Sequence, residues 1–422
     1  MKKTSLNILF TSIIFFTASI SNNAYSQIDK NGGSIYSIFG LGDLNYSSSV
    51  RTDAMGVLGL SLYGNYTNSL NPAAWIRIPG TRFSTKFNFV NIKESDGTNN
   101  ATRNYGNFEG FNLSIPLNQN NGWIFDMGIN HFSIVNYDIK FDGTSGSENF
   151  TQIYSGNGGI SRIGFGFSYL IFRHFGIGLQ VNYTFGNITK STTIDFVNPD
   201  LYDTRNRISN SLSGFYFNTG LIFHGLGKLL KSKSFDELNI GVFFSTPGKF
   251  NSSLSGRFET SAQTDSLNFK DGKIDIPWSA GFGISNLFFK KITVAADVFF
   301  QNWDNFKSYG VHPSEIKNNL RIGLGAEYIY SKKLDASFFE SIAYRLGASY
   351  TSDYLRLKDK SINSYGVHAG LSLPISRLNS VDLSFNYSTR GTTSDGLIKD
   401  DVFKIGASIN IGELWFLKPK EE

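Results

Sequence analysis

The sequence predicts an all-β protein, a transmembrane antiparallel β-barrel of about fourteen strands. Three observations support this fold class. From Arg82 almost to the C-terminus, apolar and polar residues alternate with period two. Aromatic residues make up 15% of the chain, including 39 Phe and 20 Tyr, which is high for a water-soluble domain. Connections between the expected strands alternate between short and long, as they do in outer-membrane barrels.

The chain begins with a pattern typical of a secretory signal peptide, over residues 1–26. Lys2 and Lys3 form a basic start, an apolar core runs from Leu6 to Ile20, and 24–26 is a small-residue cleavage site. A membrane anchor would need about 20 unbroken apolar residues, whereas Ser and Thr interrupt this core. We therefore expect export, with a mature chain that starts near Gln27.

Composition narrows the remaining classes. The chain has no cysteine, which excludes a disulfide framework and thiolate metal sites. Its mean hydropathy of −0.17, with no further long apolar run, excludes a bundle of membrane-spanning helices. The net charge of +5 gives a pI near 9.0, but no block of basic residues suggests a nucleic-acid partner.

Period-two alternation separates two faces in every expected strand. Near the C-terminus, Phe403 and Ile405 share one face, and Lys404 and Gly406 share the other. The polar face is small and sometimes charged, which suits a crowded barrel interior, while the bulky apolar face suits lipid. The expected strands begin near Arg82, Arg103, Gly122, Phe150, His174, Arg207, Leu238, Ile274, Ile292, Leu320, Ser341, Tyr365, Val381 and Val402.

Short connections are expected after even-numbered strands, and longer polar ones, such as 93–102, 304–318 and 352–362, after odd-numbered strands. One even connection, 225–236, is longer and is expected to contain a helical turn. The barrel domain is assigned to residues 81–416 and is followed by a charged C-terminal tail, 417–422. At its end, Trp415 and Phe416 fit either an interfacial aromatic girdle or a small surface cluster.

Residues 27–80 lack the alternation and are rich in Gly, Ser and Asn. Apolar residues such as Phe39, Met55 and Leu58 give this segment anchors for packing, so it is a separate compact segment and not a linker.

Three stretches resemble the FadL/TodX type of outer-membrane barrels, which transport long-chain fatty acids and hydrocarbons. They are NPAAW at 71–75, STPGKFNSSLSGRFE at 245–259 and IPWSAGFGISNLFFKKITVAADVFFQNWDNF at 276–306. The resemblance implies a monomeric barrel of fourteen strands, with residues 27–80 folded inside the lumen as an N-terminal hatch. It also implies that Asn71, Pro72 and Ala73 match the family's hatch motif, although an ordinary Asn-Pro turn explains the same letters. The segment 143–149, GTSGSEN, departs from the long apolar outer loops of the family.

The third expected strand contains an irregularity between Gly128 and Ser133. An outward apolar face runs through Met127 and Ile129, but in a regular strand His131 and Ser133 would then face lipid, and the outward phase would resume at Val135 and Tyr137. Either a bulge shifts the register or the wall is open. The resembled family has a lateral exit at this strand. The candidate kink comprises Gly128, Asn130, His131, Phe132 and Ser133.

Four large apolar residues fall on the otherwise polar lumen face: Tyr216, Phe243, Leu287 and Phe299. They are candidates for a hydrophobic ligand path, and packing against the hatch explains them equally well.

No enzyme is expected. None of the Gly-x-Ser triplets extends to Gly-x-Ser-x-Gly, and no Ser and His are paired on the expected outer wall. The five histidines lack metal-binding spacing, so neither a metal nor a cofactor is expected.

Two functions remain open. The first is a cell outer-membrane channel for passive uptake of small hydrophobic compounds, fatty-acid-like or hydrocarbon, with a lateral exit at the third strand. The second is an accessory or binding partner of a protein secretion system at the cell surface. The expected partners are outer-membrane lipid, a hydrophobic small molecule and, during biogenesis, the barrel-assembly machinery; no nucleic acid is expected.

Overall fold

The computed structural model describes residues 33–47, 49–229, 235, 237–331, 336–376 and 378–413. The signal peptide assigned to 1–26, the pair Trp415 and Phe416, and the tail 417–422 lie outside the described residues.

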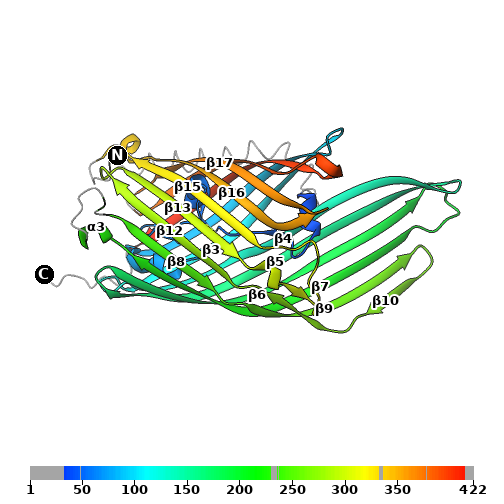
Figure 1. Ribbon diagram of the computed structural model, residues 1–422, viewed down its shortest axis with the longest axis horizontal. Helices are drawn as coiled ribbons and strands as arrows, with labels where there is room; N and C mark the ends of the chain where they lie inside the picture. The colour runs from blue at the N-terminus through cyan, green and yellow to red at the C-terminus, as the bar shows by residue number, and fades with distance from the viewer. Residues whose placement is uncertain are drawn as a thin grey trace, which may run out of the picture.

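The structure confirms a closed antiparallel β-barrel of fourteen strands (Figure 1). Six long strands come first: β2 (Thr81–Ser95), β3 (Asn100–Asn118), β4 (Trp123–Ser145), β5 (Glu148–Phe172), β6 (Phe175–Phe196) and β7 (Thr204–Phe223). The next three wall positions are β8 (Asn239–Ser245) with β9 (Gly248–Thr260), β11 (Gly272–Ile276) with β12 (Ser279–Phe288), and β13 (Ile292–Gln301). The last five are β15 (Asn319–Ile329), β16 (Ala343–Leu357), β17 (Lys360–Pro374), β18 (Ser380–Gly391) and β19 (Lys399–Glu413).

The last strand closes the barrel on the first. β19 pairs with β2 from Lys399↔Ser95 to Glu413↔Thr81, so this ladder runs the full length of both strands. Phe403 is 40% exposed on the outer face, whereas Gly406 is buried inside, as the alternation predicted. Side-chain burial alternates in the same way along the other membrane-facing strands.

Strands replace two of the predicted long loops. Within 93–102, β2 continues to Ser95 and β3 begins at Asn100. Within 352–362, β16 and β17 are joined by a turn of two residues, Lys358 and Asp359. These predictions were wrong because cross-strand pairing continues beyond the membrane, where no lipid-facing alternation marks a strand. The predicted loop 304–318 exists and contains η4 (Trp303–Asn305) at its start and β14 (Lys307–Ser308). The helical turn predicted in 225–236 is α3 (Leu226–Leu229).

The wall has unequal height. The outer parts of β4 to β7 and of β9, together with β10 (Thr264–Asn268), project beyond the shorter strands β12, β13 and β15 (Figure 1). We call this part the projecting sheet, residues 136–145, 148–159, 187–196, 204–211, 253–260 and 264–268.

The N-terminal segment that was expected to form a hatch is described over residues 33–47 and 49–80, and we keep the name hatch for it. It contains η1 (Ile35–Ile38), β1 (Asp43–Leu44), α2 (Val50–Met55) and η2 (Pro72–Arg77). Its helices pack on the inner side of the wall: η1 on β4, α2 on β15 to β19, and η2 on β4 to β7. Two short helices complete the described residues, α4 (Phe338–Ser341) and η5 (Ser394–Gly396). Within these ranges, no helix has the length and apolar character needed to cross a membrane.

Candidate functional site

The Asn-Pro-Ala motif starts η2 against the barrel wall. Pro72 occupies the first position of this helix, where its missing N–H costs nothing, and Asn71 is the N-cap, accepting a 3.0 Å hydrogen bond from the Ala73 backbone N–H. The Asn71 side-chain amide also donates to the Leu60 carbonyl at 2.6 Å and to the Leu221 carbonyl of β7 at 3.4 Å. The motif therefore joins two parts of the hatch to each other and to the wall.

We expect Asn71→Ala to weaken the seating of the hatch by about 1–3 kcal/mol, because it leaves a buried carbonyl and a helix N–H without partners. Hydrogen exchange, read by mass spectrometry, should become faster in peptides that cover 60–77. The matched control is Asn91→Ala, since Asn91 lies on β2 and its hydrogen bond to Asn104 is exposed. Equal exchange in the two variants would contradict the role of the motif.

Lumen-facing glycines let the hatch backbone approach the wall closely. A Cβ at Gly347 would lie 1.9 Å from the Met55 carbonyl oxygen, and one at Gly325 would lie 2.1 Å from the same atom. At the other end of the hatch, a Cβ at Gly220 would lie 1.8 Å from the Asn71 side-chain oxygen. The small inner faces of these strands are thus the surface on which the hatch sits.

Buried ion pairs tie α2 to the wall. Arg51 of α2 donates two hydrogen bonds to Glu327 of β15, at 2.9 and 2.7 Å, and Arg345 of β16 donates to the same carboxylate at 2.8 Å. Glu327 is only 3% exposed, so water screens these pairs little. The carboxylate holds one arginine of the hatch and one of the wall.

A second set of ion pairs centres on Asp53 of α2. Its carboxylate lies 2.8 Å from the Lys86 ammonium of β2 and 3.1 Å from that of Lys404 of β19. Burial alone would raise the pKa of Asp53, but the two ammonium groups outweigh it and hold this pKa far below its usual range. Asp53 is therefore ionised at every physiological pH.

The N-terminal part of the hatch seals the outer mouth of the barrel. Tyr36, Leu41 and parts of η1 enter a buried apolar cluster that also contains Trp303 and Tyr354 from the wall and its loops. Burial raises the pKa of Tyr36 to about 12, so its hydroxyl stays protonated and can donate to the Ile398 carbonyl. Apolar side chains close this end, in contrast to the charged contacts around α2.

The wall opens between β3 and β4. Their ladder stops at Gly110↔Asn130, although β4 continues on β5 to Ser145 and β3 continues on β2 to Asn100. The register of β4 on β5 shifts between His131 and Ser133, so Phe132 is the extra residue of a bulge. We call the unpaired region the side gap. It begins inside the segment selected from the sequence.

The bulge also reverses the phase of β4. Val135 and Tyr137 were expected to return to the lipid face, but both are buried inside the apolar cluster. One inserted residue exchanges the two faces of a strand, and the segment beyond Ser133 therefore presents its odd residues inward. This also buries the Ser133 side chain on the inner side instead of placing it in lipid.

A piece of the hatch fills the inner side of the gap. β1 pairs with β4 through Asp43↔Ile134 and Leu44↔Ser133, and the Asn45 backbone N–H donates to the Phe132 carbonyl at 2.9 Å. At the lower rim, His131 Nε2 lies 2.9 Å from the Phe108 carbonyl of β3. β1 thus occupies part of the edge of β4 that β3 leaves unpaired.

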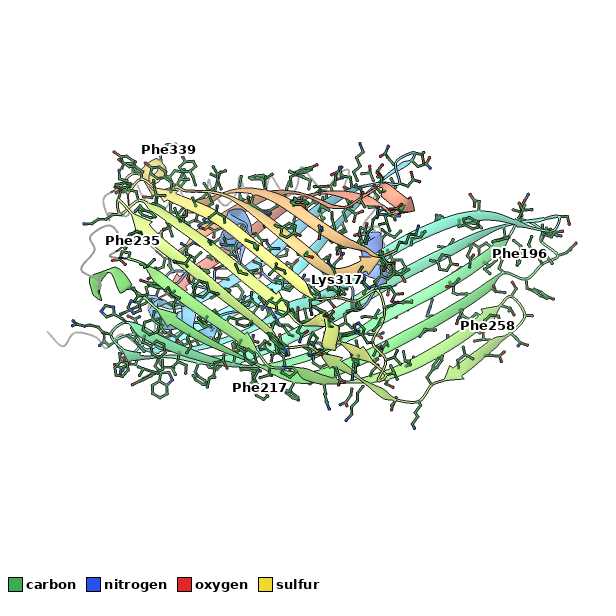
Figure 2. The ribbon with its side chains drawn as sticks, in the orientation of Figure 1. Phe196, Phe217, Phe235, Phe258, Lys317 and Phe339 are labelled. Atoms are coloured by element: carbon green, nitrogen blue, oxygen red, sulfur yellow. The ribbon has the colours of Figure 1, made fainter. Side chains whose placement is uncertain are left out.

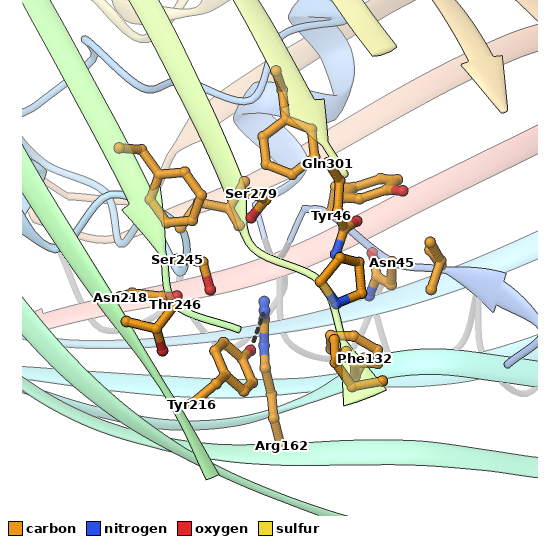
Figure 3. A pocket seen from close by; sticks show the side chains of 16 residues that line it. Asn45, Tyr46, Phe132, Arg162, Tyr216, Asn218, Ser245, Thr246, Ser279 and Gln301 are labelled. Carbon is orange, nitrogen blue, oxygen red and sulfur yellow. Dashed lines mark hydrogen bonds between the residues drawn. The ribbon is translucent and has the colours of Figure 1, made fainter. Parts of the chain in front are cut away.

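Beside β1 lies a small cavity of about 40 Å³ (Figure 3). Leu44 of the hatch and Phe132 of the bulge line it, as do three of the four residues proposed for a ligand path: Tyr216, Phe243 and Phe299. One water needs about 10–15 Å³ of such a cavity, whereas ligand pockets span about 300–1,000 Å³. The cavity therefore holds at most a few waters.

Polar groups line one side of this cavity. Arg162 of β5 donates to the Tyr216 hydroxyl at 3.2 Å (Figure 3). It also donates to the Ser69 hydroxyl of the hatch at 3.2 Å. Leu287 does not line the cavity. It lies near the short-turn end of β12, whereas the cavity lies near Ser279 at the other end of that strand.

The polarity of the wall inverts in the projecting sheet. Its inner face, continuous with Tyr137, includes Phe141 and Tyr154, which are 57% and 37% exposed, and the paired rings of Phe150 and Phe196. Its outer face consists of polar rows, such as Asn136, Asn157, Thr189, Ser209 and Ser255. Beyond the membrane the outer face meets water, so apolar side chains here point inward. Phe196 and Phe258 lie in the projecting sheet, at the end of the barrel opposite Phe235 and Phe339 (Figure 2).

One chain of hydrogen bonds resembles a hydrolase triad. Ser349 Oγ lies 2.8 Å from His368 Nε2, and His368 Nδ1 lies 2.8 Å from Asn386 Oδ1. These residues face the lumen, where a Cβ at Gly56 of the hatch would lie 2.5 Å from the imidazole ring. None of them lines the cavity beside β1 or the hollow over β7, β9 and β11. Within the described ranges, no group of His, Cys, Asp and Glu residues could hold a metal ion.

Sequence reasoning missed two features of the site. Glu109 is a second bulged residue, since β3 shifts its register on β2 between Lys86 and Phe87, and its carboxylate accepts hydrogen bonds from Asn45 of the hatch and from Asn88. The ion pairs of α2 were also not foreseen. The available signal was the set of charged residues on lumen faces, which must be paired when buried.

Comparisons with known proteins agree with this geometry. A family model described as BamG matches residues 7–422. Among solved structures, the toluene transporter TbuX of Ralstonia pickettii is similar at a TM-score of 0.60 and 14% identity, covering 87% of this chain and 98% of its own. A FadL homologue of Pseudomonas aeruginosa reaches 0.58 at 13% identity, covering 87% and 99%. The monoaromatic hydrocarbon channel CymD reaches 0.57 at 15% identity, covering 89% and 99%. No curated protein matches the chain. The resemblance seen in the sequence therefore holds at the level of the fold.

Proposed function

The chain belongs to the BamG family, and we propose that it is an outer-membrane barrel, not an enzyme, through which small hydrophobic compounds enter the membrane passively. The ligand would be fatty-acid-like or a hydrocarbon. The observation that carries the proposal is the position of the cavity: Phe132 and Leu44 line it, and the same two residues form the bulge and the hatch strand at the side gap.

Apolar surface extends from the cell surface toward this cavity. The inner face of the projecting sheet continues through Tyr137 into the apolar cluster at the mouth, and Tyr216 belongs both to that cluster and to the cavity. Long strands thus provide the apolar collecting surface that the short loop at 143–149 does not. A solute that left through the side gap would pass into lipid without crossing water.

The path is closed in this conformation, because the cavity is small and β1 pairs with β4. Transport therefore requires β1 to leave its position. We expect the disulfide in Leu44→Cys/Ser133→Cys to abolish uptake, since these residues are directly paired and the chain contains no other cysteine. Uptake of a radiolabelled fatty acid or toluene into cells would be measured with and without reductant.

Two controls make the result interpretable. The reduced double variant should transport like the wild type, and its barrel should show the same heat-dependent shift on a gel. Undiminished uptake by the fully oxidised protein would rule out the side gap as the exit.

A second function is favoured by the closed interior together with the exposed apolar face of the projecting sheet. This combination suits an accessory or binding partner of a secretion system at the cell surface, which needs no open lumen. Such a protein should keep its function in cells when the disulfide locks the hatch, whereas a transporter should lose it. Outer-membrane lipid and, during biogenesis, the barrel-assembly machinery remain proposed partners, and we propose a monomer.

A further inference from the structure

The outer wall carries an open hollow of about 530 Å³ over the paired strands β7, β9 and β11. Its lining includes Ser211, Ser213, Asn251, Ser253, Asp271 and Lys273. Leu212, Ser252 and Gly272 complete the lining. The side chains of Leu212 and Ser252 are buried toward the lumen, so the residues that alternate with them, Ser211, Ser213, Asn251 and Ser253, point outward. The hollow therefore faces the surroundings of the barrel and is separate from the path through the lumen.

Aromatic residues below the hollow mark the membrane interface. The Trp278 ring lies 6.2 Å from that of Phe244 and 5.6 Å from that of Phe300, which forms a girdle group on the outer wall. Lys273 lies five residues beyond Trp278 toward the outer end of the strands. With about 3.3 Å per residue and a tilt of about 45°, the hollow lies roughly 12 Å above the girdle, at the level of lipid headgroups.

One cation lines the hollow, and two more lie beyond its upper end. Lys273 lies directly opposite Asn251 in the lining, two residues from the carboxylate of Asp271, which also lines the hollow. Arg207 and Arg257 lie directly opposite each other above the lining residues. Like charges directly opposite each other in a sheet repel, and an anion between them relieves this repulsion. In the part of the chain that the structure describes, no carboxylate forms an ion pair with Lys273 or Arg207, and the pair of Arg257 with Glu259 is long, at 3.4 Å, and exposed.

From this arrangement we infer that the hollow binds the phosphorylated sugar headgroup of an outer-leaflet glycolipid. Hydroxyl and amide groups of the serines and Asn251 offer hydrogen bonds to sugar hydroxyls, and the flanking cations pair with phosphate. The acyl chains of the same molecule would lie on exposed Phe215 and Phe217 directly below. Glycolipid bound here would fix the height and orientation of the projecting sheet relative to the membrane.

Native mass spectrometry of the full-length mature barrel in mild detergent tests this inference. The probe is bis-phosphorylated lipid A, compared with its dephosphorylated form, with phosphatidylglycerol and with the free phosphorylated disaccharide. We expect Lys273→Ala/Arg257→Ala to lower the affinity for bis-phosphorylated lipid A at least about tenfold, because each charge-assisted contact contributes about that factor. The control Lys93→Ala/Lys140→Ala removes two exposed outward lysines from β2 and β4 and should retain wild-type affinity.

Each comparison has a defined outcome. Equal affinity for dephosphorylated lipid A or for phosphatidylglycerol would overturn the inference, as would equal losses in the two double variants. Binding of the free disaccharide at the same affinity as lipid A would keep the site and identify a soluble acidic glycan as its source. All four substituted residues are exposed, so the heat-dependent shift of the barrel on a gel should be unchanged and should exclude misfolding.

Discussion

Glu327→Ala is expected to unseat the hatch, with a larger effect than Asn71→Ala. The change leaves Arg51 and Arg345 without their common carboxylate in a buried site. Breaking a buried ion pair by removing one partner costs about 3–5 kcal/mol, because the remaining charge stays desolvated. Hydrogen exchange of the α2 amides should accelerate strongly, while the strands remain protected.

The control for this variant is Glu259→Ala, which removes the carboxylate of an exposed pair with Arg257, worth at most about 1 kcal/mol. It should leave exchange in α2 unchanged. Planar-bilayer recording adds a functional readout, since an unseated hatch should raise ion conductance through the lumen. If Glu327→Ala keeps both wild-type conductance and wild-type exchange in α2, these ion pairs do not hold the hatch.

Gly347→Val should displace the hatch from the barrel wall by a steric clash. The new Cβ would lie 1.9 Å from the Met55 carbonyl oxygen, and a backbone atom in a helix cannot move aside as a flexible side chain can. Ordinary overpacking costs about 1–3 kcal/mol, and a collision with backbone should exceed that range. We expect the barrel to assemble with α2 displaced, seen as proteolytic cleavage within 50–56 and as increased conductance.

Gly106→Val is the matched control, because its nearest neighbour outside the adjoining residues is the Asn88 carbonyl oxygen at a comfortable 3.7 Å. It should resist cleavage like the wild type. If Gly347→Val fails to assemble, Gly347→Ala gives the same test with a smaller side chain. A protected, seated α2 in the assembled Gly347→Ala barrel would show that the close glycine contact is not required.

In regular strands within the membrane, the side chains that face outward could be predicted from the sequence because the cause is local. In a membrane each side chain faces either lipid or lumen, and the two environments alternate from one residue to the next. Phe403 on the lipid face and Gly406 on the lumen face follow this alternation. The Asn-Pro-Ala turn was predictable for the same reason, since Asn71 caps a helix that begins at the next residue in the chain. Beyond the membrane this record stops, and the strands that replace the loops near 93–102 and 352–362 were missed.

The sequence by itself determined a cysteine-free chain, the number of strands, the outer and inner faces of regular strands such as β19, and the position of the irregularity in β4. It did not determine the faces of β4 beyond that irregularity, where Val135 and Tyr137 turn inward. Only the tertiary structure decided how that irregularity is resolved. A bulge at Phe132 is compatible with continuous pairing of β4 on both sides. The side gap exists because, beyond the bulge, β3 stays paired with β2 and β4 stays paired with β5, so that β3 and β4 separate. The same holds for Glu327, whose partners lie 276 and 18 residues away in the chain. Such contacts depend on which segments the closed barrel brings together, and no local pattern of side chains encodes that.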